Sequence, residues 1–145
     1  MLWEIGPAVR RDRTLLLLRL ASGGVFVAFG AGKFINQASE LASFRAYGLP
    51  APEAFVIVIG AIELIGGALV ITGLFTRWAA LVLAGDMFGA IIVSGLGRGE
   101  LVSLTLAPAQ LLAMAALLRQ GPGPYTVRRI SSRIAAMGGV GGSQQ

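Results

Sequence analysis

Four apolar stretches, each long enough to cross a bilayer, constrain this chain more than any other feature of its sequence. They cover residues 14–34, 52–74, 77–97 and 100–118. A helix needs about 20 predominantly apolar residues to span the hydrocarbon core of a membrane. Charged residues make up only 13% of the 145-residue chain, whereas about a quarter of a soluble domain is charged. The sequence therefore predicts an all-α membrane protein, a bundle of four transmembrane helices.

The segment between the first two stretches, residues 35–52, is too polar to cross a membrane. A short helix is expected here, with Ser39 as its N-cap. Three large side chains share one face of this helix: Leu41, Phe44 and Tyr47. A helix with one such face can lie flat on the membrane surface. We therefore expect a short interfacial helix after the first span.

The two ends of the chain are basic and lie outside the spans. Residues 1–13 are expected to form a cytoplasmic N-terminal basic segment, residues 14–119 the four-span membrane domain, and residues 120–145 a basic tail. Within the tail, residues 125–137 combine arginines with apolar residues at helical spacing, which is typical of a helix that binds an anionic lipid surface. The glycine-rich end of the tail is predicted to be disordered.

Lys and Arg are distributed unequally between the two sides of the membrane. With four spans, both termini lie on one side, together with the loop between the second and third spans. That side carries eight of these cations and the opposite side carries three: Arg10, Arg11, Arg13, Arg77, Arg119, Arg128, Arg129 and Arg133 against Lys33, Arg45 and Arg98. Cytoplasmic loops carry the excess of positive charge. We therefore expect a protein of the bacterial inner membrane with both termini in the cytoplasm.

Composition also narrows the chemistry of the chain. The net charge is +5, but the cations flank apolar segments and do not form one solvated face, which argues against nucleic-acid binding. The chain contains no Cys and no His, so no haem, iron–sulfur cluster or zinc is expected. If redox chemistry occurs here, the electrons belong to a bound organic molecule or to a partner protein.

Two carboxyl groups, Glu63 and Asp86, lie near the middle of adjacent apolar stretches. A carboxylate at the centre of a bilayer costs several kcal/mol unless it is paired, protonated or hydrated, so such residues are functional candidates. Counted from the tight turn at residues 73–77, Glu63 is about 12 and Asp86 about 10 residues away, which places them within about 3 Å of the same depth. We predict that Glu63 and Asp86 handle protons.

Three further polar residues are candidate ligand-binding groups: Arg19, Lys33 and Gln110. Arg19 lies inside the first span, and its long side chain can reach Glu63. In an alternative interpretation, Arg19 and Glu63 form a buried ion pair that only sets the register of the helices. Lys33 lies at the outer end of the first span, where its side chain can instead extend to the interface.

Asp86 lies within a G-x-x-x-G pattern formed by Gly85 and Gly89. This pattern is common where two membrane helices make contact. The sequence therefore predicts close helix packing beside Asp86.

A set of short motifs occurs in order along the chain: Arg19, Gly30-Ala31-Gly32-Lys33-Phe34, Tyr47-Gly48-Leu49-Pro50, Glu63-Leu64-Ile65-Gly66-Gly67, Gly73-Leu74-Phe75-Thr76-Arg77 and Gly121-Pro122-Gly123-Pro124-Tyr125. Each motif is weak alone. The ordered set resembles the DoxX family of small four-helix bacterial membrane proteins, over residues 14–126.

The resemblance implies a role beside membrane redox enzymes. The family takes its name from relatives of a subunit of a thiosulfate:quinone oxidoreductase, and some members are linked to membrane-associated redox complexes. Arg19, Lys33, Glu63 and Arg77 match family positions, whereas the importance of Asp86 rests on the physical argument alone. The leading hypothesis is a quinone-binding or redox-complex-associated membrane subunit, with quinone as the ligand, no covalent cofactor, and a redox protein as partner.

Two other functions stay open from the sequence. A small proton-coupled permease, assembled as a homo-oligomer, would use Glu63 and Asp86 as its coupling groups. A non-catalytic membrane scaffold would use the same polar residues only to set the register of its helices.

Overall fold

Helices account for nearly all of the chain that the structure describes. The computed structural model describes residues 7–138, with the elements α1 (Pro7–Ile35), α2 (Gln37–Ala46), α3 (Pro52–Thr72), α4 (Thr76–Ala90), the π-helix η1 (Ile91–Leu96), α5 (Leu101–Gln120) and α6 (Val127–Gly138). Four segments are long and apolar enough to cross a membrane: α1, α3, α4 continued by η1, and α5. The predicted all-α fold with four spans is confirmed. The predicted disordered end of the tail lies outside the described residues.

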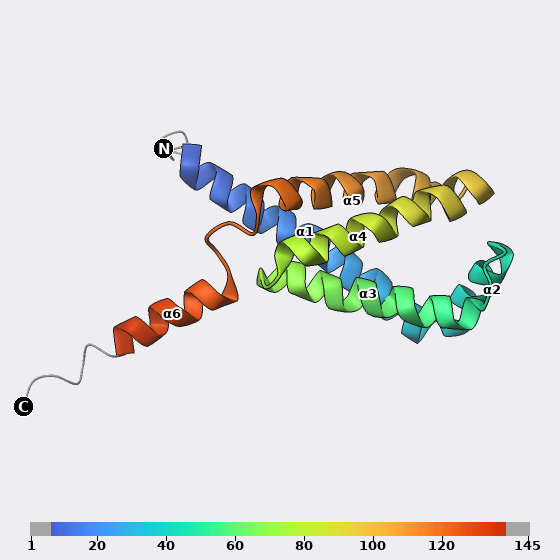
Figure 1. Ribbon diagram of the computed structural model, residues 1–145, viewed down its shortest axis with the longest axis horizontal. Coiled ribbons are helices and arrows are strands. Elements are labelled where there is room, and N and C mark those ends of the chain that lie inside the picture. Colours follow the sequence, from blue (N-terminus) through green and yellow to red (C-terminus); the bar gives the residue numbers. More distant parts are fainter. Residues whose placement is uncertain (1–6, 139–145) are drawn as a thin grey trace, which may run out of the picture.

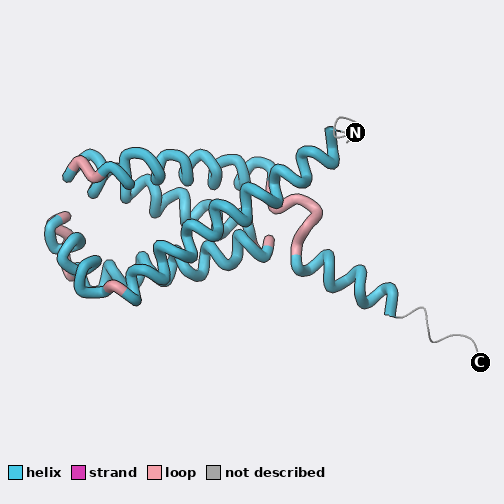
Figure 2. The backbone as a smooth tube through the Cα atoms, turned by 180° about the vertical axis from the view of Figure 1, so that it is seen from behind, coloured by secondary structure: helices cyan, strands magenta, loops and turns pink. Residues whose placement is uncertain are grey.

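The four spans form two pairs that converge at one end and diverge at the other (Figure 1). α1 packs mainly along α3, and α4 packs mainly along α5. The pairs meet near the turn between α3 and α4 and separate toward α2, as the view from behind also shows (Figure 2). We call the part of the bundle near the α3–α4 turn the closed half, and the part near α2 the open half.

Glycines bring α1 and α3 into close contact. A Cβ atom on Gly30 would lie 2.6 Å from a backbone nitrogen of α3, and one on Gly67 would lie 2.8 Å from the carbonyl oxygen of Gly23. These separations are too short for a real side chain, so only glycine permits the two helices to approach this closely. The close approach places Lys33 of α1 beside Glu63 of α3.

Apolar side chains fill the closed half. Its core includes six residues of α1, α3, α4 and α5 that are each at most 4% exposed: Leu15, Val70, Ala80, Leu83, Met114 and Leu117. Close packing of these side chains holds the two helix pairs together at that end. The packed core therefore occupies the half of the bundle that the termini share.

α2 begins earlier than the sequence suggested. It starts at Gln37, directly after the cap residue Asn36, and Ser39 lies within its first turn. The expected N-cap at Ser39 is therefore wrong. Phe44 is buried, and its ring centroid lies 5.5 Å from that of Tyr47. The aromatic face expected for this helix is turned toward the open half.

Arg19 binds backbone carbonyl groups in the closed half. Its side chain donates to the carbonyl oxygens of Val70 and Ile71 at 2.9 and 2.6 Å, and to those of Pro122 and Tyr125 at 2.9 and 2.6 Å. The carbonyl groups of the last turn of a helix lack partners within the helix, and a cation is favourable there. Arg19 thus caps α3 and ties the segment after α5 to the bundle.

α6 extends away from the bundle (Figure 1). The backbone N–H of Arg129 donates to the Oγ1 atom of Thr126 at 3.3 Å, so Thr126 caps the helix. One side of α6 carries four exposed apolar residues: Val127, Ile130, Ile134 and Met137. The remaining surface carries three arginines, Arg128, Arg129 and Arg133, together with small residues. α6 therefore has the basic amphipathic pattern expected from the sequence.

Replacing Arg19 with Met should destabilise the fold, because four carbonyl groups lose their donor. A hydrogen bond to a charged group contributes roughly 1.5–3 kcal/mol. We therefore expect the free energy of unfolding in mild detergent to fall by about 3 kcal/mol or more. Arg119→Met is the matched control, since Arg119 is exposed on the last turn of α5. Equal stability of the two variants would contradict the role of Arg19 as a cap.

α6 should bind the surface of an anionic membrane. The chain has no cysteine, so Met137→Cys introduces a unique position for an environment-sensitive fluorophore. Each Arg near an anionic surface contributes about 1 kcal/mol, so the emission should be bluer in phosphatidylglycerol nanodiscs than in phosphatidylcholine nanodiscs. Substituting Arg128, Arg129 and Arg133 with Gln should remove this difference. Equal emission of the labelled parent protein in the two kinds of nanodisc would show that α6 does not bind the anionic surface.

Candidate functional site

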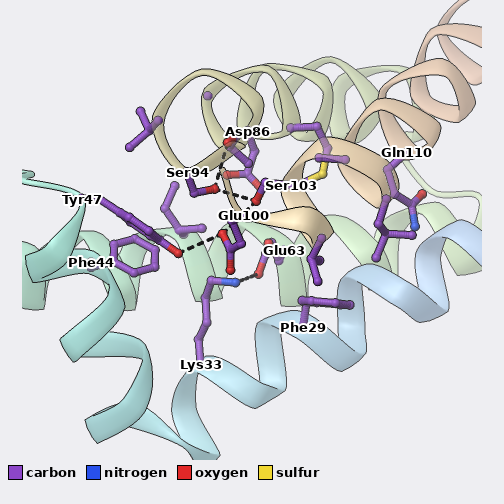
Figure 3. A pocket seen from close by; sticks show the side chains of 18 of the residues that line it. Phe29, Lys33, Phe44, Tyr47, Glu63, Asp86, Ser94, Glu100, Ser103 and Gln110 are labelled. Atoms are coloured by element: carbon purple, nitrogen blue, oxygen red, sulfur yellow. Dashed lines mark hydrogen bonds and ion pairs between the residues drawn. The ribbon is translucent and has the colours of Figure 1, made fainter. Parts of the chain in front are cut away.

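A cavity of about 310 Å³ lies in the open half, between the two helix pairs (Figure 3). α1, α2, α3, α4, η1 and α5 all contribute to its wall. Small-molecule sites usually enclose about 300–1,000 Å³, so the cavity has the size to hold a small organic ring system. Much of its wall is apolar and includes five aromatic rings: Phe26, Phe29, Phe44, Tyr47 and Phe55.

Lys33 and Glu63 form a buried ion pair on the wall of this cavity. The Nζ atom of Lys33 lies 2.7 Å from Oε2 of Glu63, and the two side chains are 9% and 5% exposed. The ammonium also lies 6.0 Å from the centre of the Phe29 ring. The alternative in which Lys33 extends to the interface is therefore wrong. Because an ammonium carries three donors, Lys33 keeps donors for a ligand oxygen after pairing with Glu63.

Asp86 faces the same cavity as Glu63 (Figure 3). Lys33, Glu63 and Asp86 all line this one cavity. The Oδ2 atom of Asp86 is buried, and it has no hydrogen-bond partner among residues 7–138. A buried polar atom without a partner costs free energy, so this oxygen is a natural contact for a ligand.

The two glycines beside Asp86 keep the cavity open. Gly85 and Gly89 both line it. A Cβ atom on either glycine would meet no neighbouring atom of the described chain within 4 Å. The helix contact expected at this G-x-x-x-G pattern is therefore wrong. The pattern instead leaves space next to the carboxyl group of Asp86.

A second polar cluster joins α2 to α5 at the end of the cavity near α2 (Figure 3). The hydroxyl of Tyr47 and the hydroxyl of Ser103 both donate to Oε2 of Glu100, each at 3.0 Å. Ser103 is also hydrogen-bonded to Ser94. Burial raises the pKa of Tyr47 to about 12, and the hydrogen bond to Glu100 adds to the rise. Tyr47 therefore keeps its proton at neutral pH and links the two helix pairs across the cavity.

Sequence reasoning missed this second cluster. Ser94 is buried and lies in the π-helix η1 that follows α4. Such π-helical turns are frequent at functional sites, but their position is not visible in a hydropathy pattern. The one available signal was the pair of hydroxyl residues, Ser94 and Ser103, on either side of the turn between the third and fourth spans.

The other two candidate ligand-binding residues, Gln110 and Arg19, lie away from the Lys33–Glu63 pair. Gln110 lines the cavity but lies apart from the Lys33–Glu63 pair in the close-up view (Figure 3). It is 5% exposed, and its Oε1 atom has no partner within the described part of the chain. Arg19 does not line the cavity. The expected contact of Arg19 with Glu63 is wrong, because Lys33 pairs with Glu63 and backbone carbonyl groups compensate the guanidinium.

The sequence matches the DoxX family model over residues 14–96, more than half of the chain. The chain belongs to the DoxX family. The matched region carries Lys33, Glu63 and Asp86, so the ion pair and the unpaired carboxyl lie within it. It ends before Glu100 and Gln110, so the part of the cavity wall from α5 lies beyond the matched residues.

Three relatives extend this comparison. The uncharacterized membrane protein Rv3486 of Mycobacterium tuberculosis is 32% identical over 86% of this chain and 86% of its own length. The Bacillus subtilis protein named Putative oxidoreductase CatD is 44% identical over 53% of this chain and 56% of its own length. An uncharacterized protein of Haemophilus influenzae is 33% identical over 63% of this chain and 66% of its own length. No solved structure matches the chain.

Removing one member of the Lys33–Glu63 pair should destabilise the protein more than removing both. Lys33→Met and Glu63→Met each leave an uncompensated buried charge, which costs about 3–5 kcal/mol. The double variant leaves neither charge behind and should keep most of the parent stability. Thermal unfolding in detergent measures all four proteins. A double variant as unstable as the sum of the two single losses would contradict a buried pair.

Proposed function

We propose that this DoxX-family protein is a membrane subunit that binds a quinone, or a similar small lipophilic molecule, in the open-half cavity and supports a redox partner protein. The observation that carries the proposal is the meeting of an aromatic wall with Lys33, Glu63 and Asp86 in one cavity. Ligand sites commonly combine an apolar wall with a few convergent polar groups in this way.

The polar groups suit the two ends of such a ligand. Lys33 has donors left for a carbonyl oxygen, and its ammonium is held in place by Glu63. Asp86 offers a carboxyl oxygen that no described residue engages. A quinone takes up protons together with electrons when it is reduced, and carboxyl groups within hydrogen-bond reach can exchange those protons. Glu63 and Asp86 are assigned this role, and the electrons come from the redox partner.

The comparisons support the redox class at a coarse level. One relative carries the name Putative oxidoreductase CatD, and it matches over about half of its length and half of this chain. The cavity itself supports a membrane-soluble ligand, because it lies between transmembrane helices and its wall carries five aromatic rings. We assign the protein to the inner membrane with both termini in the cytoplasm, on the distribution of its Lys and Arg residues.

A proton-coupled permease is the competing function. Transport requires a route that opens in turn to both sides of the membrane. The cavity lies in the open half, whereas a packed apolar core fills the closed half. This arrangement favours a binding site over a transport route. Proteoliposomes with an imposed pH gradient should accordingly show no solute flux above that of empty vesicles, and saturable flux would favour the permease.

Ubiquinone or menaquinone analogues with short tails should bind the purified protein saturably in nanodiscs. Gly89→Leu should weaken binding by on the order of tenfold or more, because it places a side chain in the space beside Asp86. Gly24→Leu is the matched control: it is also helical with open space at its Cβ, but it does not line the cavity. A spectral titration of the three proteins measures the dissociation constants.

Two results would overturn the proposed function. One is the lack of saturable binding of either analogue to the parent protein. The other is equal binding to the parent, Gly89→Leu and Gly24→Leu proteins, because a leucine at position 89 would occupy space that a ligand in the cavity needs. If Glu63→Gln and Asp86→Asn also leave the recruitment of partner proteins unchanged, the scaffold hypothesis would explain the polar residues better.

A further inference from the structure

Carboxyl groups outnumber ammonium groups on the wall of the cavity. Four carboxyl side chains line it, against one ammonium: Glu40, Glu63, Asp86 and Glu100 against Lys33. A carboxylate only accepts hydrogen bonds. A ligand that carries only acceptors can therefore form a hydrogen bond with the ammonium but not with the four carboxylates.

Three donor groups of the cavity wall already donate to carboxyl groups of the protein. The hydroxyl groups of Tyr47 and Ser103 both donate to Glu100. Lys33 donates to Glu63. Lys33 keeps two of its three donors, whereas a wall acceptor that no described residue engages needs a donor from outside the chain.

Two buried acceptor atoms of the cavity wall are left without a partner in the structure of residues 7–138. They are Oδ2 of Asp86 and Oε1 of Gln110. Gln110 is 5% exposed, so bulk water does not reach it freely. Leaving a buried acceptor unsatisfied costs about 1–3 kcal/mol, and more for a charged group. A ligand that donates to these atoms recovers that cost.

We propose that the cavity prefers the reduced, hydroxyl-bearing form of its ligand, a quinol, over the oxidised quinone. This inference rests on the proposed function, since it concerns the same cavity and the same ligand class. One quinol hydroxyl donates to Oδ2 of Asp86. The second hydroxyl can donate to another acceptor of the wall, such as Oε1 of Gln110. A quinone has only carbonyl acceptors, so it contacts Lys33 but leaves both acceptor atoms unpaired.

The preference has a consequence for the redox behaviour of the bound ligand. Tighter binding of the reduced form stabilises it, so the midpoint potential of the bound couple rises above that of the free couple. A tenfold preference corresponds to a rise of about 30 mV for a two-electron couple. The site would therefore withdraw quinol from the membrane pool in preference to quinone.

Three ligands that share one ring and one short tail test this inference. They are the quinone, the quinol, and the quinol with both hydroxyl groups methylated, which keeps the shape of the ring but has no donor. Binding to the full-length protein in nanodiscs is measured without oxygen. We expect the quinol to bind at least about tenfold more tightly than the quinone and the methylated quinol. The midpoint potential of the bound couple should rise accordingly.

Variants connect this preference to the named atoms. Asp86→Asn keeps the size of the side chain but replaces a carboxyl oxygen with an amide donor, and it should reduce the preference for quinol by on the order of tenfold. Glu53→Gln is the control, because Glu53 is an exposed carboxylate of α3 that does not line the cavity. It should leave the preference unchanged.

The outcomes separate this inference from the proposed function. Saturable binding with quinone as tight as quinol, or tighter, would overturn the preference and leave quinone binding in place. Equal affinity of quinol and methylated quinol would overturn it as well, since the methylated form has no donor. If none of the three ligands binds saturably, the proposed function fails together with the inference.

Discussion

The ion pair between Lys33 and Glu63 is the interaction on which the cavity depends. A lone charge inside a bilayer costs several kcal/mol, so each of these residues requires the other. Lys33 lies on α1 and Glu63 on α3, and the two helices can carry the pair at 2.7 Å because glycines let them approach closely. The pair uses one carboxyl group and leaves Asp86, on the other helix pair, without a partner. The structural requirement for compensation thus produces a free acceptor in the cavity.

The two halves of the bundle compensate buried polarity in different ways. In the closed half, Arg19 is satisfied by backbone carbonyl groups, and an apolar core surrounds it. All four of its hydrogen bonds are internal, and among the described residues the one buried side-chain oxygen without a partner near this end is Oγ1 of Thr76. In the open half, the polar side chains point into a cavity and two buried oxygens stay unpaired. The chain therefore separates a stabilising region from a region that is incomplete without a ligand.

Much of this fold follows from the sequence, because hydropathy and length determine the spans and the family motifs identify the bundle. Counting residues from the α3–α4 turn also brought Glu63 and Asp86 to one depth, and the structure places both on one cavity. The hydrogen-bond partners of Arg19 did not follow from the sequence. The sequence predicts a contact of Arg19 with Glu63, but carbonyl oxygens at the end of α3 accept its hydrogen bonds instead. The contact of Tyr47 with Glu100 joins residues 53 positions apart, and it depends on how the helix pairs diverge, which a linear pattern does not record.

Native mass spectrometry of the protein, extracted gently from bacterial membranes, tests the central claim most directly. The open-half cavity should retain a lipophilic molecule that is released on unfolding and identified by its mass as a quinone or quinol. The Gly24→Leu protein should retain it to the same extent, and the Gly89→Leu protein should carry little or none. A parent protein that is isolated without such a ligand, or that carries the same amount as the Gly89→Leu protein, would contradict a ligand site in the open half.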